Sequence, residues 1–358
     1  MADRKPIAIA NRSIGPGHEP YIVAEMSGNH NGDIDRAFRI LDAAKQAGAD
    51  AVKIQTYRAD TITIDHDGPG FVVEGGLWGG RGLFELYTEA HTPWEWHAPM
   101  FEYARKIGIT IFSSPFDPTA VDLLEELGAP AYKIASPELI DLPLIRYVAK
   151  TGKPIIMSTG MANREEIGEA IAAARDAGAS DLVVLHCTAA YPAPIEEANL
   201  ATIPEIARSF DVIVGLSDHT LGTSVASMAV ALGADFVEKH FTLDRSEGGV
   251  DSAFSLEPHE LAELVTSTRQ ARTALGSPAF SPTASEASVL MNRRSLYVVA
   301  PIGAGEVFTH ENVRSIRPGF GMKPKLLDRV LGQRAARDIA FGEPLAVDMI
   351  QDGLKPGS

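Results

Sequence analysis

The amino-acid sequence predicts an α/β protein, a (β/α)8 TIM barrel followed by a small, mostly β domain. Apolar runs and helical stretches alternate along the chain through eight units, which is the number that closes such a barrel. Polar side chains follow the apolar runs, at the end of the barrel where chemistry takes place. The 358 residues exceed a barrel of about 250 residues by about 100, so a second, smaller domain is expected.

Each expected strand is an apolar run that stops at polar or glycine residues. The first helix, 34–47, has Asp33 as its N-cap and Gly48 as its stop, and a helix at 257–275 closes the barrel. The eight expected strands are residues 21–27, 51–57, 109–117, 131–136, 154–160, 182–188, 212–216 and 235–241.

One long connection, residues 58–93, interrupts the alternation. It is rich in glycine and aromatic residues, and so long a loop in a compact domain is usually functional or disordered. Its aromatic content argues against disorder, so we expect a lid or rim for a substrate. Trp78 and Tyr87 are candidates for substrate contacts, whereas Trp94 and Trp96 could equally pack the following helix against the barrel.

The composition changes after the barrel, which is expected to span 1–275. Residues 276–288 are rich in serine and proline and are interpreted as a linker. Residues 289–358 show short β-like runs between glycine and proline turns and form the expected C-terminal domain. Its loop at 317–324 carries Arg317 and is either a solvated basic turn or a ligand-contacting loop.

Two histidines stand at the ends of neighbouring expected strands. His219 and His240 would face one another at the mouth of a parallel barrel, where imidazoles are candidate ligands for a divalent metal. Glu238 and His240 are two residues apart and should both point into the barrel, with Lys239 pointing towards the helices. The alternative is that each histidine is a hydrogen-bonded core residue.

Hydroxyl groups and lysines at the other strand ends describe an anion site. Serine hydroxyls would donate to phosphate oxygens and lysines would neutralise their charge. A lysine on a barrel strand could instead form a Schiff base, as in metal-free aldolases. The residues expected at the mouth, besides the two histidines, are Glu25, Lys53, Ser114, Lys133, Ser136, Ser158, Ser217, Asp218 and Glu238.

Composition excludes several classes of function. The net charge of −15 argues against a nucleic-acid partner, because phosphate backbones demand a basic surface. No apolar run approaches the ~20 residues of a membrane span, and the first residues lack the apolar core of a signal peptide, so a cytoplasmic location without membrane contact is expected. The one cysteine, Cys187, excludes an intrachain disulfide.

Several long motifs in a fixed order resemble the sialic acid synthase family. They are AEMSGNHNGD, ADAVKIQTY, AYKIAS, KPIIMSTGM, LHCTAAYP, GLSDHTLG, EKHFTLDR, FSLEP and RPGFGMKP, and the resemblance runs roughly from Ile14 to Met349. It implies a (β/α)8 barrel joined to an antifreeze-like (SAF) domain and a domain-swapped homodimer. The implied reaction condenses phosphoenolpyruvate with an N-acetylated amino sugar and gives phosphate and a nine-carbon α-keto acid.

Within the family, EMSGNHNG, the insertion GLWGGRGLFELYTEAHTPWEW and EGGVDSAFSLEP most resemble the pseudaminic acid synthase subfamily. The implied sugar is 2,4-diacetamido-2,4,6-trideoxy-altrose, an acetamido sugar. The N-acetylneuraminic and legionaminic acid synthases share the core motifs and remain alternatives. A Schiff-base aldolase remains the alternative from another class.

The resemblance also implies roles for individual residues. His219 and His240 match the ligands of a divalent metal, Mn2+ or Mg2+, and Arg317 matches an arginine that the partner subunit sends into the site. Glu25 matches a carboxylate near the reacting carbons and Asp251 an acid near the sugar. Ala189 departs from the family pattern, and Tyr191 stays available for the substrate. The implied phosphoenolpyruvate contacts are Lys53, Ser114, Lys133, Ser136, Ser158 and Ser217.

Overall fold

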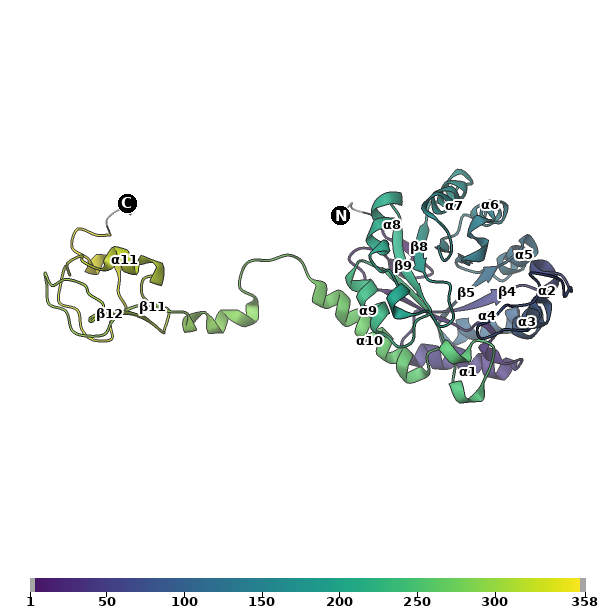
Figure 1. Cartoon of the computed structure of the whole chain (residues 1–358), viewed down its shortest axis with the longest axis horizontal. Helices are drawn as coiled ribbons and strands as arrows, with labels where there is room; N and C mark the ends of the chain where they lie inside the picture. The colour runs from purple at the N-terminus through teal and green to yellow at the C-terminus, as the bar shows by residue number, and fades with distance from the viewer. Residues whose placement is uncertain (1–3, 355–358) are drawn as a thin grey trace. The chain divides into compact units, whose positions relative to one another are not determined.

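The computed structural model describes residues 4–354, which divide into two compact units at Gly276 and Ser277. Figure 1 shows the first unit as a barrel of strands surrounded by helices, and the second as a small domain with short strands. Each unit is described separately below. No helix among the described residues is long and apolar enough to cross a membrane.

Eight parallel strands close into a barrel, which confirms the predicted fold. Each strand pairs with the next along the chain, and the last strand pairs with the first, Phe236 opposite Tyr21. The strands are β3 (Tyr21–Glu25), β4 (Ala51–Thr56), β5 (Thr110–Pro115), β6 (Tyr132–Ile134), β7 (Ile155–Ser158), β8 (Leu182–Cys187), β9 (Ile213–Asp218) and β10 (Phe236–His240).

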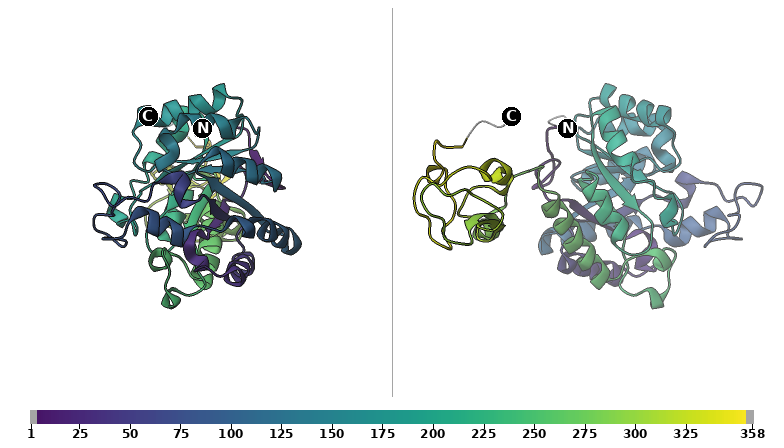
Figure 2. Two further views of the ribbon diagram at one scale, coloured as in Figure 1. Left: turned by 90° about the vertical axis from the view of Figure 1, so that its right-hand side faces the viewer. Right: turned by 60° about the vertical axis from the view of Figure 1, so that its left-hand side comes forward.

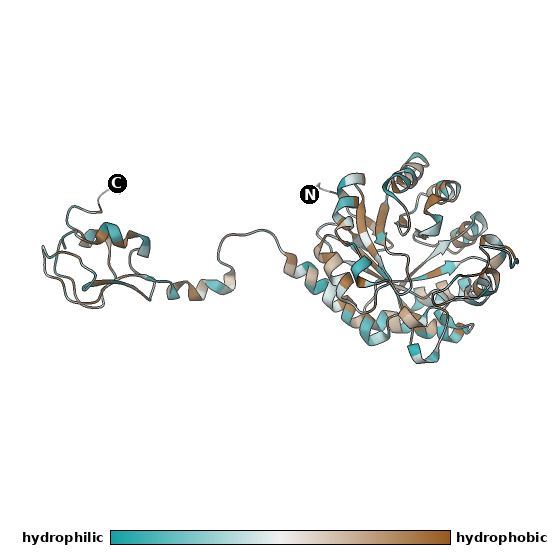
Figure 3. Ribbon diagram, viewed as in Figure 1, coloured by the Kyte–Doolittle hydropathy of each residue, from teal (hydrophilic) through white to brown (hydrophobic). Residues whose placement is uncertain are grey.

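Helices between the strands cover the barrel. They bury an apolar layer between themselves and the outer face of the strands, which includes Ile22, Val52 and Leu216. Figure 3 shows the apolar colouring of the strands inside this ring. The main helices are α1 (Ile34–Ala47), α4 (Trp94–Ile107), α5 (Pro118–Glu126), α6 (Leu142–Ala149), α7 (Arg164–Asp176), α8 (Thr202–Phe210), α9 (Ser224–Ala231) and α10 (Pro258–Leu275).

Capping residues set the ends of several strands and helices. Asp33 caps α1 by accepting from the amide of Asp35, as predicted. The third strand was expected to reach Asp117, but it ends at Pro115 because Asp117 caps α5 and accepts from the amides of Thr119 and Ala120. The fourth strand is likewise shorter than expected, since Ser136 already begins the next helical turn.

A short hairpin that the sequence did not predict closes the N-terminal end of the barrel. Its strands are β1 (Ile7–Ile9) and β2 (Arg12–Ile14), paired antiparallel. Ile9 and Ile14 are fully buried and pack with the barrel interior around Tyr21. Three-residue strands give too little alternation to detect in a sequence. Chemistry is thereby confined to the other end of the barrel.

The insertion at 58–93 contains two short helices, α2 (Ala59–Ile62) and α3 (Leu83–Ala90). Figure 2 shows part of it extending outwards from the barrel. A β-bridge between Val72 and Gly82 closes the loop between the two helices. The helix after the insertion was expected to begin at Thr92, but α4 begins at Trp94.

The second unit has its own small core. Strands β11 (Ser295–Val298) and β12 (Val313–Ile316) pair antiparallel, and isolated bridges such as Ile302 with Ile339 extend the pairing. Buried side chains including Leu296, Phe308 and Leu345 form the core. A helical segment, η6 (Ala284–Asn292), begins inside the expected linker, and a short helix, α11 (Leu327–Val330), lies after β12.

Candidate active site

Polar side chains from six strands meet at the C-terminal end of the barrel. Side chains alternate between the two faces of a strand, so one residue near each strand end points inward. All six are buried, and hydrogen bonds or ion pairs join them. They are Glu25 of β3, Lys53 of β4, Ser114 of β5, Lys133 of β6, Ser217 of β9 and Glu238 of β10.

Two lysines and two glutamates form one buried network. Lys53 Nζ lies 2.7 Å from Glu25 Oε2 and 3.8 Å from Glu238 Oε1. Lys133 Nζ donates to the same Glu238 oxygen at 2.8 Å. Each of the four side chains is paired, and their formal charges cancel. The network can therefore keep four ionisable groups away from water.

The serines surround this network. Lys53 Nζ donates to Ser114 Oγ at 3.3 Å, and Ser217 Oγ donates to Glu238 Oε1 at 3.2 Å. Ser158 Oγ is buried and has no hydrogen-bond partner among the described residues, which suits a group that donates to a ligand. Ser136 packs against the backbone of Gly160, where a Cβ would lie 2.4 Å from the Ser136 Cβ.

Burial and pairing shift the pKa values of the network. Burial raises the pKa of Glu25, and Lys53 only partly offsets this effect. Burial also opposes the charge on Glu238, but Lys133 and Lys53 outweigh it and lower the pKa of Glu238. Burial lowers the pKa of Lys133 despite its contact with Glu238. Two neighbouring glutamates are thus shifted in opposite directions, a pattern that separates acid and base roles.

Gln55 and Ser27 extend the network towards Asp251. Gln55 Nε2 donates to Glu25 Oε1 at 2.9 Å and to Ser27 Oγ at 3.0 Å. Ser27 in turn hydrogen-bonds to Asp251, whose pKa is raised by burial. The expected site did not include Gln55 or Ser27. Alternation from Lys53 could have identified Gln55. Ser27 ends the expected strand 21–27, but β3 stops at Glu25 and Ser27 begins a helical turn, where alternation no longer applies.

The two histidines lie beside each other, with ring centroids 5.4 Å apart. His219 Nδ1 donates to the carbonyl oxygen of Thr188 at 3.0 Å, so a metal would bind at Nε2. Despite burial, the Cys187 side chain and the Thr188 carbonyl raise the pKa of His219, so a metal at Nε2 would compete with a proton there. His240 Nδ1 is buried without a hydrogen-bond partner among the described residues. Burial lowers the pKa of His240, and nearby charged groups including Lys53 and Lys133 lower it further, so its ring is neutral.

A cavity of about 290 Å3 opens beside these residues. Ser27, Gln55, His240 and Asp251 form its polar side. The rest of the wall is mainly apolar or aromatic and comes largely from the insertion. These residues are Tyr57, Val73, Trp78, Leu83, Leu86, Tyr87, Ala90, Phe116, Ala135, Pro137, Tyr191 and Val250.

Trp78 connects the insertion to the other side of the cavity. Its Nε1 donates to the carbonyl oxygen of Val250 at 2.8 Å, and its ring centroid lies 5.5 Å from that of Tyr191. Trp94 instead donates to the carbonyl oxygen of Tyr57, and Trp96 packs on the edge of His30. Trp94 and Trp96 therefore hold α4 against the barrel, which is the alternative that the sequence left open.

Two expected residues lie outside this cluster. Asp218 was expected at the mouth, but it lies on the outer side of β9, where it pairs with Lys239 at 2.7 Å. Arg317 lies in the second unit, exposed and directly after β12, so the barrel cluster is built without it. The expected outward direction of Lys239 agrees with its contact to Asp218.

Comparison with known proteins identifies the two units. A model of the NeuB family matches residues 40–279, and a model of the SAF domain matches residues 293–351. The chain belongs to the NeuB family. The resemblance to the sialic acid synthases is thereby confirmed.

Relatives in the NeuB family align over most of the chain. The pseudaminic acid synthase of Campylobacter jejuni (serotype O:2) is 46% identical over 91% of this chain and 95% of its own. That of Helicobacter pylori is 43% identical over 94% and 99%. The N,N'-diacetyllegionaminic acid synthase of Legionella pneumophila is 34% identical over 92% and 94%.

Solved structures of family members have the same fold. The spore coat polysaccharide biosynthesis protein SpsE of Bacillus subtilis superimposes with a TM-score of 0.67 at 35% identity, covering 97% of this chain and 99% of that one. The N-acetylneuraminic acid synthetase of Leptospira borgpetersenii, solved with citrate, gives 0.72 at 32% identity over 80% and 95%.

The two histidines of this NeuB member could hold a metal ion. His219 Nε2 and His240 Nδ1 are both free to coordinate, and a neutral imidazole is the form that binds metals. No group of three or more His, Cys, Asp or Glu side chains suited to a metal occurs among residues 4–354. Two protein ligands leave the remaining coordination positions for substrate oxygens or water.

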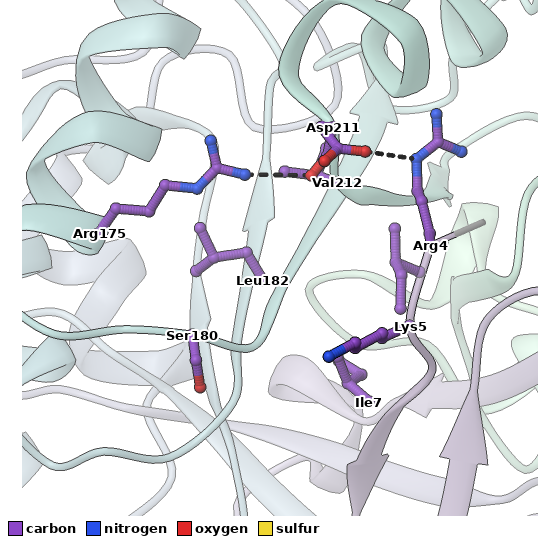
Figure 4. A pocket seen from close by; sticks show the side chains of 9 residues that line it. Arg4, Lys5, Ile7, Arg175, Ser180, Leu182, Asp211 and Val212 are labelled. Atoms are coloured by element: carbon purple, nitrogen blue, oxygen red, sulfur yellow. Dashed lines mark hydrogen bonds and ion pairs between the residues drawn. The ribbon is translucent and has the colours of Figure 1, made fainter. Parts of the chain in front are cut away.

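A larger cavity, of about 380 Å3, lies at the opposite end of the barrel (Figure 4). Arg4 Nε lies 3.5 Å from Asp211 Oδ1, and Arg175 donates to the carbonyl oxygens of Phe210 and Asp211. Both arginines thus bind the C-terminal end of α8, where free carbonyls attract cations. This cavity is remote from the strand-end cluster, and its charged groups serve the packing of α8.

Proposed function

We propose that this chain is a pseudaminic acid synthase, which condenses phosphoenolpyruvate with 2,4-diacetamido-2,4,6-trideoxy-altrose. The products are a nine-carbon α-keto acid and phosphate. The observation that carries the proposal is the 46% identity to the C. jejuni pseudaminic acid synthase over 91% of the chain. Identity to the N,N'-diacetyllegionaminic acid synthases is lower, at 34% and 37%. Those enzymes represent the alternative choice of sugar.

Phosphoenolpyruvate is proposed to bind at the lysines and serines. Lys53 and Lys133 would neutralise its phosphate and carboxylate, and Ser114, Ser136, Ser158 and Ser217 would donate to its oxygens. The buried Ser158 hydroxyl without a partner supports this proposal. An anion that binds here competes with Glu25 and Glu238 for the lysines. The raised pKa of Glu25 favours its protonated form, which competes less for Lys53 and so favours binding of the anion.

The carboxylates are proposed to move protons during the reaction. C3 of phosphoenolpyruvate attacks the aldehyde carbon of the open-chain sugar, water adds at C2, and the C2–O bond to phosphate then breaks. Glu25 Oε2 is our candidate for the proton of this water or of the new hydroxyl, because burial raises its pKa. Gln55 holds the other Glu25 oxygen at 2.9 Å and so fixes the carboxyl plane.

A divalent metal, Mn2+ or Mg2+, is proposed at His219 and His240. When bound, such an ion would polarise the aldehyde as a Lewis acid. Asp251 lies near the same place, with its Oδ2 3.9 Å from His240 Nδ1, and is proposed to orient a hydroxyl of the sugar. Tyr191 stacks beside His219 at 4.4 Å between ring centroids and is proposed to pack on the sugar.

The Schiff-base aldolase is the less favoured function. A Schiff base needs a neutral lysine amine, whereas Glu238 and Glu25 raise the pKa of Lys53 despite its burial, and Lys133 Nζ is engaged by Glu238 at 2.8 Å. Borohydride reduction with substrate would trap a covalent adduct on Lys53 or Lys133 if the aldolase were correct.

A homodimer is proposed as the active form, with Arg317 of the partner subunit completing the site. The exposed position of Arg317 after β12 supports an intermolecular role. The proposed location is the cytoplasm. Sedimentation velocity on wild-type protein and on an Arg317→Ala variant would separate assembly from catalysis, since only activity should fall in the variant.

Phosphate release from phosphoenolpyruvate with Mn2+ and a panel of acetamido sugars tests the function. We expect release with 2,4-diacetamido-2,4,6-trideoxy-altrose and a product mass that equals the sum of sugar and pyruvate. Release with N-acetylmannosamine alone would keep the chemistry and refute the choice of sugar. Absence of release with every sugar would refute the proposed function.

A further inference from the structure

The hydrogen-bonded ladder between β9 and β10 stops just before the two histidines. Its last register pair joins Asp218 of β9 to Lys239 of β10. His219 follows the end of β9, and His240 is in register with Glu25 of β3 on the other side. The β9–β10 register therefore contains neither histidine. The backbone of each histidine is held separately, His219 by Ala193 and His240 by Leu256, and neither of these hydrogen bonds joins one histidine to the other.

Side chains behind the barrel wall supply such a connection. Lys239 Nζ donates to Asp218 Oδ2 at 2.7 Å and to the carbonyl oxygen of Thr220 at 2.5 Å. The amide and hydroxyl of Thr220 both donate to Asp218 Oδ1, at 2.9 and 2.8 Å. Asp218 and Thr220 flank His219, and Lys239 precedes His240. The ammonium group of Lys239, the residue before His240, thus binds both residues that flank His219.

Stability alone is a weak reason for this arrangement. The side chains of Lys239 and Asp218 are each 1% exposed, so both charges are removed from water. The cost of that desolvation roughly cancels the attraction, and apolar residues of similar volume often replace a buried ion pair without loss of stability. The ion pair is one of four directed hydrogen bonds in this group. Together they fix the geometry of the backbone that carries them.

We propose that Lys239 and Asp218 are positioning residues, which set the spacing of His219 and His240 from behind the barrel wall. The inference rests on the proposed role of the two histidines as metal ligands. Neither Lys239 nor Asp218 touches substrate or metal in this scheme. They act through the backbone that carries the ligands, and loss of a group that hydrogen-bonds a metal ligand directly costs roughly 10- to 100-fold in metal affinity, so the lower end of that range is expected here.

The test compares single and double substitutions in the full-length protein. Lys239→Met leaves a buried carboxylate without its cation and should lower the melting temperature, whereas Lys239→Met/Asp218→Asn removes both charges and should restore it to within a few degrees of wild type. Asn at 218 can still accept from Thr220. Isothermal titration with Mn2+ alone should nevertheless show at least roughly 10-fold weaker binding for the double variant.

An ion pair between α10 and the residue before β10 provides a control. Arg272 Nη2 binds Asp235 Oδ1 at 2.5 Å, beside the first residue of β10 and far from the histidines. Arg272→Met/Asp235→Asn should leave Mn2+ affinity and the KM for phosphoenolpyruvate unchanged. This control shows whether the loss of another ion pair beside β10 also lowers the affinity for Mn2+.

Three outcomes would overturn the inference. The first is a stable double variant that binds Mn2+ as tightly as wild type. The second is an equal loss in the Arg272→Met/Asp235→Asn control. The third is unchanged Mn2+ affinity in His219→Ala, because Lys239 and Asp218 would then have no metal ligand to position. Weaker Mn2+ binding together with no condensation of any sugar would support the inference and refute the proposed function.

Discussion

Replacing Trp78 tests whether the insertion at 58–93 closes over the sugar. Trp78 makes three contacts across the cavity: a hydrogen bond to the carbonyl oxygen of Val250 at 2.8 Å and ring contacts with Tyr191 at 5.5 Å and Phe254 at 6.3 Å. Trp78→Ala removes all three. Trp78→Phe keeps an aromatic ring and removes only the hydrogen bond.

The contacts give the expected magnitudes. A hydrogen bond of this kind contributes about 1 kcal/mol, and each aromatic pair contributes about 0.5–1.5 kcal/mol. Their sum for Trp78→Ala is about 2–4 kcal/mol, and the lower value corresponds to a roughly 30-fold decrease in kcat/KM for the sugar, since 1.4 kcal/mol is a factor of ten. Trp78→Phe should lose about 1 kcal/mol, or roughly fivefold.

Steady-state kinetics with each substrate varied in turn measure this effect. We expect the KM for the sugar to rise, while the KM for phosphoenolpyruvate stays the same because Lys53 and Lys133 lie on barrel strands. Leu77→Ala is the matched control, since Leu77 is the neighbouring residue, is 47% exposed and does not line the cavity. Equal losses for both substrates, or unchanged kinetics in Trp78→Ala, would refute a closing role for the insertion.

Two further substitutions test the charges and ligands of the site, and a third tests Glu138, a carboxyl group in the helical turn η2 (Pro137–Ile140) after β6. Glu238→Gln should lower the free energy of unfolding by about 3 kcal/mol in urea at pH 7, because it leaves Lys133 without its anion; a change below about 1 kcal/mol would contradict the buried pairing. His240→Ala should weaken Mn2+ binding at least roughly 100-fold by calorimetry, and unchanged affinity would exclude His240 as a ligand. Burial raises the pKa of Glu138 from 4.5 to about 7, so its ionisation opposes folding increasingly from about pH 4.5 and fully above about pH 7. Glu138→Gln should therefore be more stable than wild type at pH 8, by up to about 3 kcal/mol, and equally stable at pH 4.5; a constant difference at both pH values would contradict the shifted pKa.

Much of the catalytic end could be predicted because alternation in a buried strand is strict. Glu238 was placed on an inward face by counting residues and Lys53 and Lys133 were expected at strand ends, and the structure joins all three in one network. Pairing partners could not be predicted in this way. Which lysine binds which glutamate depends on distances between strands, and the cancellation of charge in the network follows only from those distances.

Ser27 and the apolar side of the cavity were beyond sequence reasoning for a different reason. Ser27 belongs to a helical turn after β3, where period-two alternation no longer applies. The insertion lies far from residues 250–254 in the sequence, and only the fold brings Trp78 to Val250. Loop contacts of this kind depend on tertiary structure and leave no periodic signal.

The misplacement of Asp218 shows how one strand boundary decides the role of a side chain. An apolar run that stops at Leu216 makes Asp218 look like a loop residue at the barrel mouth. β9 in fact continues to Asp218, and because Ser217 points inward to Glu238, Asp218 must point outward. The register then places it opposite Lys239, whose outward direction alternation had already predicted. Two charges on the apolar outer face of a barrel need each other as partners, so the outward Lys239 was itself the signal that a neighbouring acid pointed the same way.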